Sequence, residues 1–114
     1  MKFIDIRARK LSHLIRVVRD TPTLDNIKYI LVYGSTARGD FDNDSDIDVM
    51  LIVEDGTPRA IDSVYSLESL LGAQVWEEPA LDIHAMRQTQ FNTLGMEEPF
   101  NRNLHKEATV VWKR

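Results

Sequence analysis

The stretch Tyr33–Val53, YGSTARGDFDNDSDIDVMLIV, decides the fold of this chain. It holds a Gly-Ser pair, Gly34-Ser35, then ten intervening residues, and then Asp46-Ile47-Asp48, which runs into an unbroken apolar segment. A Gly-Ser turn between a strand and a helix can hold a triphosphate through backbone N–H groups and a hydroxyl. Two Asp at i and i+2 of a strand face the same way, about 7 Å apart along the chain. Carboxylates at that spacing can hold two divalent cations about 4 Å apart.

Composition places the chain among ordinary globular proteins. Its 114 residues predict a single domain, residues 1–114, that buries about 65% of its unfolded surface. It contains 43% hydrophobic and 28% charged residues and no cysteine, which excludes disulfides, thiolate metal sites and cysteine nucleophiles. The longest apolar run, Val49–Val53, is too short to span a membrane, and charged residues soon after Met1 interrupt any signal-peptide core. We therefore expect a cytoplasmic protein that does not enter a membrane.

Charge is unevenly spread along the chain. The net charge is −4, which makes the chain a poor candidate for gripping a long nucleic acid, so direct nucleic-acid binding is not expected. Residues 40–48 hold five Asp and no basic residue, whereas residues 1–20 hold six basic residues and two acidic ones. We interpret the basic N-terminal segment as the solvated face of a helix. The alternative is a surface that contacts an acidic partner.

Hydrophobic periodicity predicts the first half of the fold. An amphipathic helix is expected at about residues 5–19, with its apolar positions at Leu11, Leu14, Ile15 and Val18. Ile27–Tyr33 reads as a strand, and Thr36–Gly39 as one helical turn with Ser35 as its N-cap. Asp46–Val53 reads as a second strand, whose apolar later half is covered on both faces.

The second half continues the alternation of helices and strands. A helix is expected with Thr57 as its cap, Pro58 at its first position and Gly72 at its end, and with a buried face formed by Ile61, Val64, Leu67, Leu70 and Leu71. Gln74–Ala80 is either the start of a strand or a loop. A third strand is expected at Leu81–Ala85, a helix after Glu98-Pro99 that uses Phe100 and Leu104, and a last strand at Thr109–Trp112. This order predicts a small α/β layer fold with helices packed on a sheet.

Asp46 and Asp48 are the strongest candidates for metal ligands and catalytic groups. Two ionised Asp on one strand face repel each other, so the pair is unfavourable without a cation. One alternative is a surface acidic loop. Another is a calcium-binding loop that starts at Asp42, but the glycine and glutamate it requires would fall on Ile47 and Val53.

A third carboxylate would complete the metal shell and accept the proton of an attacking hydroxyl. Asp82 fits this role because it lies between Leu81 and Ile83 and points to the opposite face of the predicted strand, which His84 shares. A solvent-facing Asp is the alternative reading. Glu77 or Glu78 could take the role if the strand register differs.

Three further features have both a structural and a functional reading. Gly34-Ser35 could be a plain turn, and it is informative only through its offset from the Asp pair. Arg38 could reach a γ-phosphate with its guanidinium fork, or could form a surface ion pair with Asp40 or Asp42. The three histidines lack the spacing of zinc ligands, and the loop lacks the Lys-Ser/Thr ending of a Walker-type loop.

The string Gly-Ser-Thr-Ala-Arg-Gly-Asp, followed by Ser45-Asp46-Ile47-Asp48-Val49, resembles the signature of the DNA polymerase β-type nucleotidyltransferases. It is similar in particular to the minimal nucleotidyltransferases, small single-domain proteins. The specific match covers about residues 30–53, and a looser match in element order covers the whole chain. The resemblance implies a polymerase β-like nucleotidyltransferase fold with a small mixed sheet.

The resemblance also implies site roles. Asp46 and Asp48 would bind two Mg²⁺ ions, Asp82 would be the third acidic residue, and Gly34 and Ser35 would hold the triphosphate of ATP. Many members of the family are antitoxins that transfer AMP from ATP to a tyrosine of a HEPN-domain toxin. By resemblance, we expect a protein adenylyltransferase with a HEPN toxin as its partner. This chain departs from the family pattern in the seven residues, Ala73–Pro79, that separate Gly72 from the region of Asp82.

Two other hypotheses remain at this stage. The chain could keep the fold but act by binding alone, covering the toxin with apolar surfaces around Trp76 and Trp112. It could also be a domain that senses a metal or a nucleotide.

Overall fold

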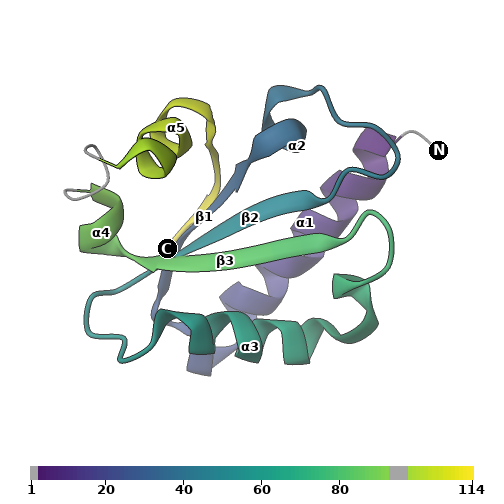
Figure 1. Cartoon of the computed structure of the whole chain (residues 1–114). Helices are drawn as coiled ribbons and strands as arrows, with labels where there is room; N and C mark the ends of the chain where they lie inside the picture. The colour runs from purple at the N-terminus through teal and green to yellow at the C-terminus, as the bar shows by residue number, and fades with distance from the viewer. Residues whose placement is uncertain (1–2, 93–97) are drawn as a thin grey trace.

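The computed structural model describes the backbone of residues 3–92 and 98–114 and the side chains of residues 6–92 and 98–114. Four strands form one mixed sheet in the order β3-β2-β1-β4. The strands are β1 (Ile27–Tyr33), β2 (Ile47–Val53), β3 (Leu81–Arg87) and β4 (Thr109–Lys113). β1 pairs antiparallel with both β2 and β4, whereas β2 and β3 are parallel. Because β2 and β3 are parallel, both strands begin at the same end of the sheet (Figure 1).

Helices lie on both faces of the sheet (Figure 1). They are α1 (Phe3–Asp20), α2 (Gly34–Arg38), α3 (Ala60–Leu71), α4 (Gln88–Asn92) and α5 (Pro99–Glu107), with short 3-10 turns at Pro22–Leu24 (η1) and Gly72–Val75 (η2). α1 and α3 cover one face through a core that includes Leu14, Val64 and Leu67. α5 covers part of the other face through Leu104.

Alternation along β2 assigns its side chains to these two faces. Val49, Leu51 and Val53 belong to the core under α1 and α3, whereas Met50 and Ile52 belong to the cluster that includes Leu104 of α5. Because side chains alternate with a period of two, Asp48 shares the face of Met50 and Ile52. β2 is therefore a covered central strand, as its apolar run predicts, and its first residues carry a carboxylate toward the α5 side.

The α/β class and the mixed sheet predicted for this chain are confirmed, as is the strand at Ile27–Tyr33. α1 extends beyond the predicted residues 5–19, β3 continues to Arg87, and Gln74–Ala80 is a 3-10 turn followed by a loop. The α4 turn was not predicted.

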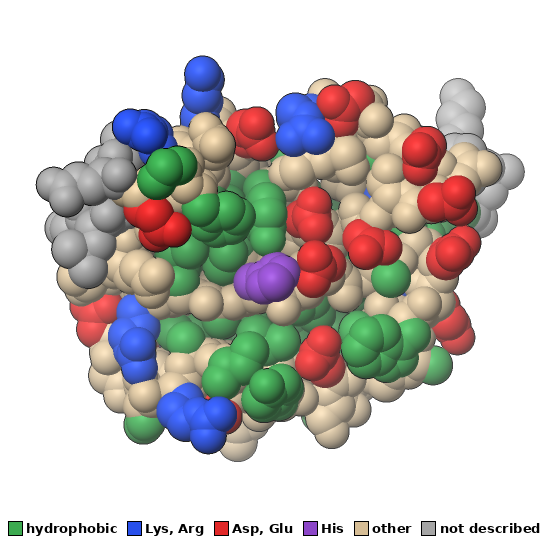
Figure 2. Space-filling model, in the orientation of Figure 1, with side chains coloured by type: hydrophobic (Ala, Val, Ile, Leu, Met, Phe, Trp, Pro, Cys, Tyr) green, Lys and Arg blue, Asp and Glu red, His purple; other side chains and the backbone are tan. Residues whose placement is uncertain are grey.

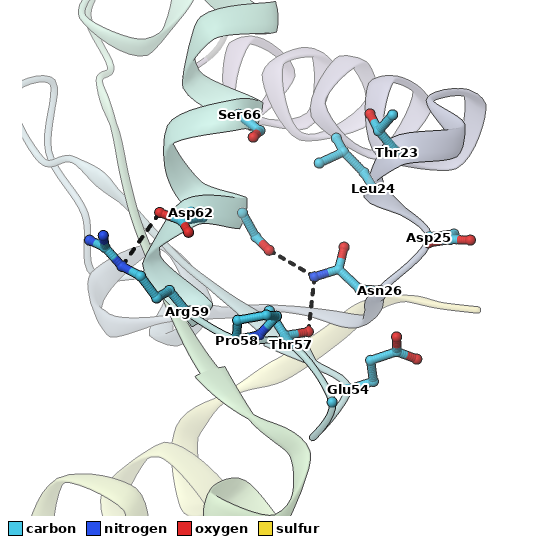
Figure 3. Close-up of a pocket in the computed structure, with 12 residues that line it drawn as sticks. Thr23, Leu24, Asp25, Asn26, Glu54, Thr57, Pro58, Arg59, Asp62 and Ser66 are labelled. Carbon is cyan, nitrogen blue, oxygen red and sulfur yellow. Dashed lines mark hydrogen bonds and ion pairs between the residues drawn. The ribbon is translucent and has the colours of Figure 1, made fainter.

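The start of α3 differs from the prediction. Thr57 and Pro58 precede the helix, which begins at Ala60 with Arg59 as its N-cap residue and no side-chain cap. The Thr57 hydroxyl oxygen instead accepts a hydrogen bond from Asn26 Nδ2 at 3.1 Å, and the same amide donates to Ser63 Oγ at 2.9 Å (Figure 3). Thr57 thus ties the loop after β2 to the residue before β1, and it does not cap a helix.

These contacts border a cavity of about 290 Å³. It lies where β1 begins and β2 ends, since Asn26 precedes β1 and Glu54 follows β2 (Figure 3). This is the opposite end of the two strands from Tyr33 and Asp48, which are paired in the sheet.

The buried face of α3 is narrower than predicted. Val64, Leu67 and Leu71 are buried, but Ile61 is 39% exposed and Leu70 is 52% exposed. At about 100° per residue, Ile61 and Leu70 lie to either side of the stripe that Val64, Leu67 and Leu71 form, so they flank the buried face.

Replacing Leu51 by Ala should lower the free energy of unfolding by about 3 kcal/mol, because it leaves a cavity where a fully buried side chain packs. The same replacement at Leu70 should change it by less than about 0.5 kcal/mol. Urea denaturation of both variants measures this. An equal cost at the two sites would place Leu70 in the core and contradict the structure.

Candidate active site

The parallel register of β2 and β3 brings two of the predicted carboxylates together. Asp48 of β2 is paired with Asp82 of β3, and the charge of Asp82 lies close enough to raise the pKa of Asp48. Asp46 lies one residue before β2, and its negative charge is close enough to raise the pKa of Asp48. Figure 2 shows acidic side chains gathered on this face, over the starts of β2 and β3 and the loop that precedes β2. The structure thus brings Asp46, Asp48 and Asp82 into one acidic group.

Asp48 lies at the centre of this group, between Asp46 in sequence and Asp82 in the sheet. It is half-buried, and its pKa is raised from the ordinary value of 3.8 by burial first and then by the negative charges of Asp82 and Asp46. The charge of His84 acts in the opposite direction. Crowding of like charges is unfavourable in the absence of a cation, so the group is electrostatically suited to binding one.

Gly34 lies against the Asp48 carboxyl. Its φ angle is +68°, and a Cβ atom built there would be 2.2 Å from Asp48 Oδ2. A side chain at this position would force the Asp48 carboxyl to move and would also strain the backbone. The offset between Gly34 and the Asp pair, read from the sequence as a motif, is therefore a direct contact in the fold.

Ser35 does not cap a helix as the sequence predicts. α2 begins at Gly34, two residues earlier than expected, and its N-cap residue is Tyr33. Ser35 lies in the first turn, and its carbonyl accepts hydrogen bonds from the backbone N–H groups of Gly39 and Asp40. Gly34 nevertheless lies against the Asp48 carboxyl, and Ser35 follows it in the first turn of α2. Their role as nucleotide ligands stays a prediction.

The oxygen atoms of the acidic group are of the kind that binds magnesium. All three are carboxylates, and carboxylate oxygens are ligands that Mg²⁺ prefers. Among residues 3–92 and 98–114, no three such side chains are already arranged as a metal-binding group. The Asp82 carboxylate is paired with His84 Nε2 at 3.0 Å. Asp46, Asp48 and Asp82 could hold the ion once that carboxylate turns toward Asp48.

Arg38 is held by two carboxylates. Its guanidinium pairs with Asp40 at 3.1 Å and with Glu107 of α5 at 3.2 Å. The first pair is the surface ion pair that the sequence offered as an alternative to phosphate binding. The second links α2 to α5 across the face that carries the carboxylates.

Asp82, rather than Glu77 or Glu78, is the acidic residue next to Asp48. Glu77 and Glu78 lie in the loop before β3, where both side chains are exposed, whereas Asp82 is in register with Asp48. His84 shares the face of Asp82, as predicted, and contacts it directly.

Tyr33 is a residue of the site that the sequence analysis did not single out. It is the last residue of β1 and is paired with Asp48 in the sheet. Burial, together with the charges of Asp48 and Asp82, raises the pKa of its hydroxyl to about 12, and its ring meets Phe100 of α5 edge-on at 6.0 Å. Its position directly before Gly34 of the Gly-Ser pair was the feature of the sequence that could have identified it as a residue of the site.

The basic face of α1 is not simply solvated, which corrects the prediction for this helix. Arg7 is 2% exposed and donates hydrogen bonds to Thr36 Oγ1 and to the carbonyls of Asp42 and Ser45. Lys10 donates to three carbonyls of the loop before β3, those of Gln74, Glu77 and Pro79. Arg7 falls in the helical repeat of Leu11, Leu14 and Val18, and that position was the signal that it faces inward.

The comparisons with known proteins agree with this geometry. The nucleotidyltransferase domain family matches residues 14–110, which is most of the chain, and the chain belongs to that family. No curated protein matches the sequence. The family assignment confirms the resemblance that the Gly-Ser and Asp-x-Asp residues carry.

Two solved structures share the fold. One is a candidate nucleotidyltransferase from Sulfolobus solfataricus, with a TM-score of 0.66 and 19% identity, covering 97% of this chain and 85% of that one. The other is a toxin-antitoxin structure with AMP-PNP, with a TM-score of 0.53 and 17% identity, covering 93% of this chain and 73% of that one. At these identities the likeness establishes a common fold. In the described part of this chain, no helix is long and apolar enough to cross a membrane.

The contact between Gly34 and Asp48 can be tested by a double-mutant cycle. Gly34→Ala should lower the free energy of unfolding by about 3 kcal/mol, because backbone strain and a collision add together. Gly39→Ala, at φ +85° with open space around it, should cost about 1 kcal/mol from backbone strain alone. In an Asp48→Ala background, the cost of Gly34→Ala should fall by about 2 kcal/mol. Urea denaturation measures each value, and additive costs would mean that the two residues do not collide.

The raised pKa of Asp48 predicts a pH-dependent gain from neutralising it. A raised folded-state pKa means that the fold loses stability as pH rises from the ordinary carboxyl value through the folded one. Asp48→Asn should therefore unfold at a higher denaturant concentration than the unmodified protein at pH 7 without metal, and the gain should vanish below about pH 4. Asp44→Asn, on the exposed loop, is the control. A loss of stability in Asp48→Asn at pH 7 would contradict the electrostatic account.

Proposed function

We propose that this chain is a magnesium-dependent nucleotidyltransferase that transfers AMP from ATP to a hydroxyl group. The observation that carries the proposal is the acidic group itself, in which Asp48 and Asp82 are in register and Asp46 is adjacent. The backbone of Gly34 lies directly against the Asp48 carboxyl of this group. Membership of the nucleotidyltransferase domain family supports the same reaction.

In the proposed reaction, the hydroxyl oxygen of the acceptor attacks the α-phosphorus of ATP. The bond from that phosphorus to the oxygen bridging to the β-phosphate breaks, and pyrophosphate leaves in line with the attack. The acceptor's proton passes to the Asp82 carboxylate, which is half exposed and can receive it. His84, paired with Asp82, would stabilise that carboxylate until the acceptor arrives.

Asp46, Asp48 and Asp82 would hold Mg²⁺, two ions by family resemblance. The metal would supply charge neutralisation at the phosphate oxygens. The protein's own contribution is the fixed position of the carboxylates at the ends of two paired strands, with Gly34 and Ser35 offering backbone N–H groups to the triphosphate. Arg38 lies beyond them on α2 and would reach the outer phosphates by exchanging a carboxylate partner for one of them.

The proposed acceptor is a tyrosine of a toxin, with a HEPN-domain protein as the partner. Two observations support a toxin partner: the family resemblance of the motif and the fold shared with a toxin-antitoxin structure that contains AMP-PNP. In this reading the chain is an antitoxin that silences its partner by modifying it.

A second candidate function is an antitoxin that neutralises its partner by binding alone. It is favoured by exposed apolar side chains on and after α3, where Tyr65 is 57% exposed and Trp76 is 73% exposed. Exposed aromatic residues of this kind are common in protein interfaces. Trp112, by contrast, is partly buried against the core.

Transfer of α-labelled AMP tests the proposal. The chain is incubated with Mg²⁺, labelled ATP and the protein encoded beside it, and label is followed on that neighbour. Asp46→Asn and Asp48→Asn should each lower the rate of labelling at least about 100-fold, since each removes a charge from the group that binds the metal. Asp44→Asn, an exposed acidic neighbour on the same loop, should retain it. A stable complex without label would reject transfer and support binding alone.

A further inference from the structure

Arg7 is a buried cation whose side chain contacts both halves of the nucleotidyltransferase motif. Nη1 donates to Thr36 Oγ1 at 2.8 Å, one residue after Ser35. Nη2 donates to the carbonyls of Asp42 at 3.0 Å and Ser45 at 2.6 Å. The guanidinium also lies over the Phe41 ring, 4.2 Å from its centroid. One side chain of α1 therefore joins α2 to the loop that leads into β2.

The loop that Arg7 holds is a closed turn. Asp42 Oδ1 accepts hydrogen bonds from the Asp44 backbone N–H and from Ser45 Oγ, each at 3.0 Å. Its own contacts fix the shape of residues 42–45, and Arg7 fixes where the turn lies relative to α2.

Asp46 is held from both sides as a result. The carbonyl of Ser45 belongs to the peptide group that joins it to Asp46, and Arg7 binds that carbonyl. The next peptide group is fixed too, because Ile47 N–H donates to the Ala80 carbonyl at 2.8 Å. Asp46 is itself exposed, so these neighbours, and not its own burial, set its position.

We propose that Arg7 is a positioning residue for nucleotide binding: by tying Thr36 to the Asp42 and Ser45 carbonyls, it holds Asp46 ready for the metal-bound triphosphate. This inference rests on the proposed function and adds a residue to it. Arg7 is 2% exposed, so it acts through the loop and does not touch the nucleotide.

The positioning role of Arg7 depends on the shape of its guanidinium group. Two of its nitrogens, held in a rigid planar fork, serve three acceptors on two separate segments, α2 and the loop before β2. Lys10 binds three carbonyls with one nitrogen, but all three lie in a single loop. A lysine at position 7 would have to reach both segments from one nitrogen. The positive charge is also retained in Arg7→Lys, so that variant separates geometry from charge. Arg16→Lys is the matched control, because Arg16 is on the same helix and exposed.

The test uses two readouts on the full chain. Amide hydrogen exchange follows residues 40–46 without nucleotide, and calorimetry follows binding of Mg²⁺ with the non-reactive analogue α,β-methylene-ATP. Arg7→Lys should exchange about tenfold faster in residues 40–46 and bind the analogue about tenfold more weakly. Arg16→Lys should match the unmodified protein in both. If Arg7→Lys fails to fold, Phe41→Leu, which removes the ring under the guanidinium, should shift both readouts in the same direction.

The outcomes separate the two proposals. Failure of the unmodified protein to bind the analogue would reject the proposed function. Normal binding in the unmodified protein with no change in Arg7→Lys would overturn the positioning role and leave the function standing. Faster exchange with unchanged binding would also overturn it, since Arg7 would then stabilise the loop without preparing the site.

Discussion

Repulsion among carboxylates is the constraint on which the rest of this structure depends. Asp48 is half-buried beside Asp82 and Asp46, and its pKa is raised by burial and by both charges. A fold selected for stability alone would separate such groups or pair each with a cation. Here the sheet register keeps two of them together, and the surrounding elements hold that arrangement in place.

Cations of α1 act on this arrangement from a distance, through the backbone. Arg7 and Lys10 bind the loops that lead into β2 and β3, the two strands that carry Asp48 and Asp82. They fix where each strand begins through backbone carbonyls, and the charge of Arg7 also interacts with that of Asp46.

The Gly-Ser pair is also placed by the carboxylates. Gly34 is the residue that lets α2 begin against the Asp48 carboxyl, because a Cβ there would lie 2.2 Å from Asp48 Oδ2. The N-terminal end of α2 thus lies beside a group of carboxylates. Backbone N–H groups favour an anion and carboxylates favour a cation, so the two features together suit the phosphate and the metal of the proposed function.

The sequence by itself determined the elements and the motif residues: the α/β order, the strand at Ile27–Tyr33, the inward alternation of Leu81 and Ile83, and the Asp-x-Asp pair before an apolar run. These follow from local periodicity, which a single chain displays directly. Only the tertiary structure decided which third carboxylate joins the pair, because the parallel register of β2 and β3 sets Asp82 opposite Asp48. It also decided that Arg7 is buried, that Leu70 is exposed and that Thr57 binds Asn26. Those outcomes depend on partners that are distant in sequence, and no local pattern specifies which ones a side chain will meet.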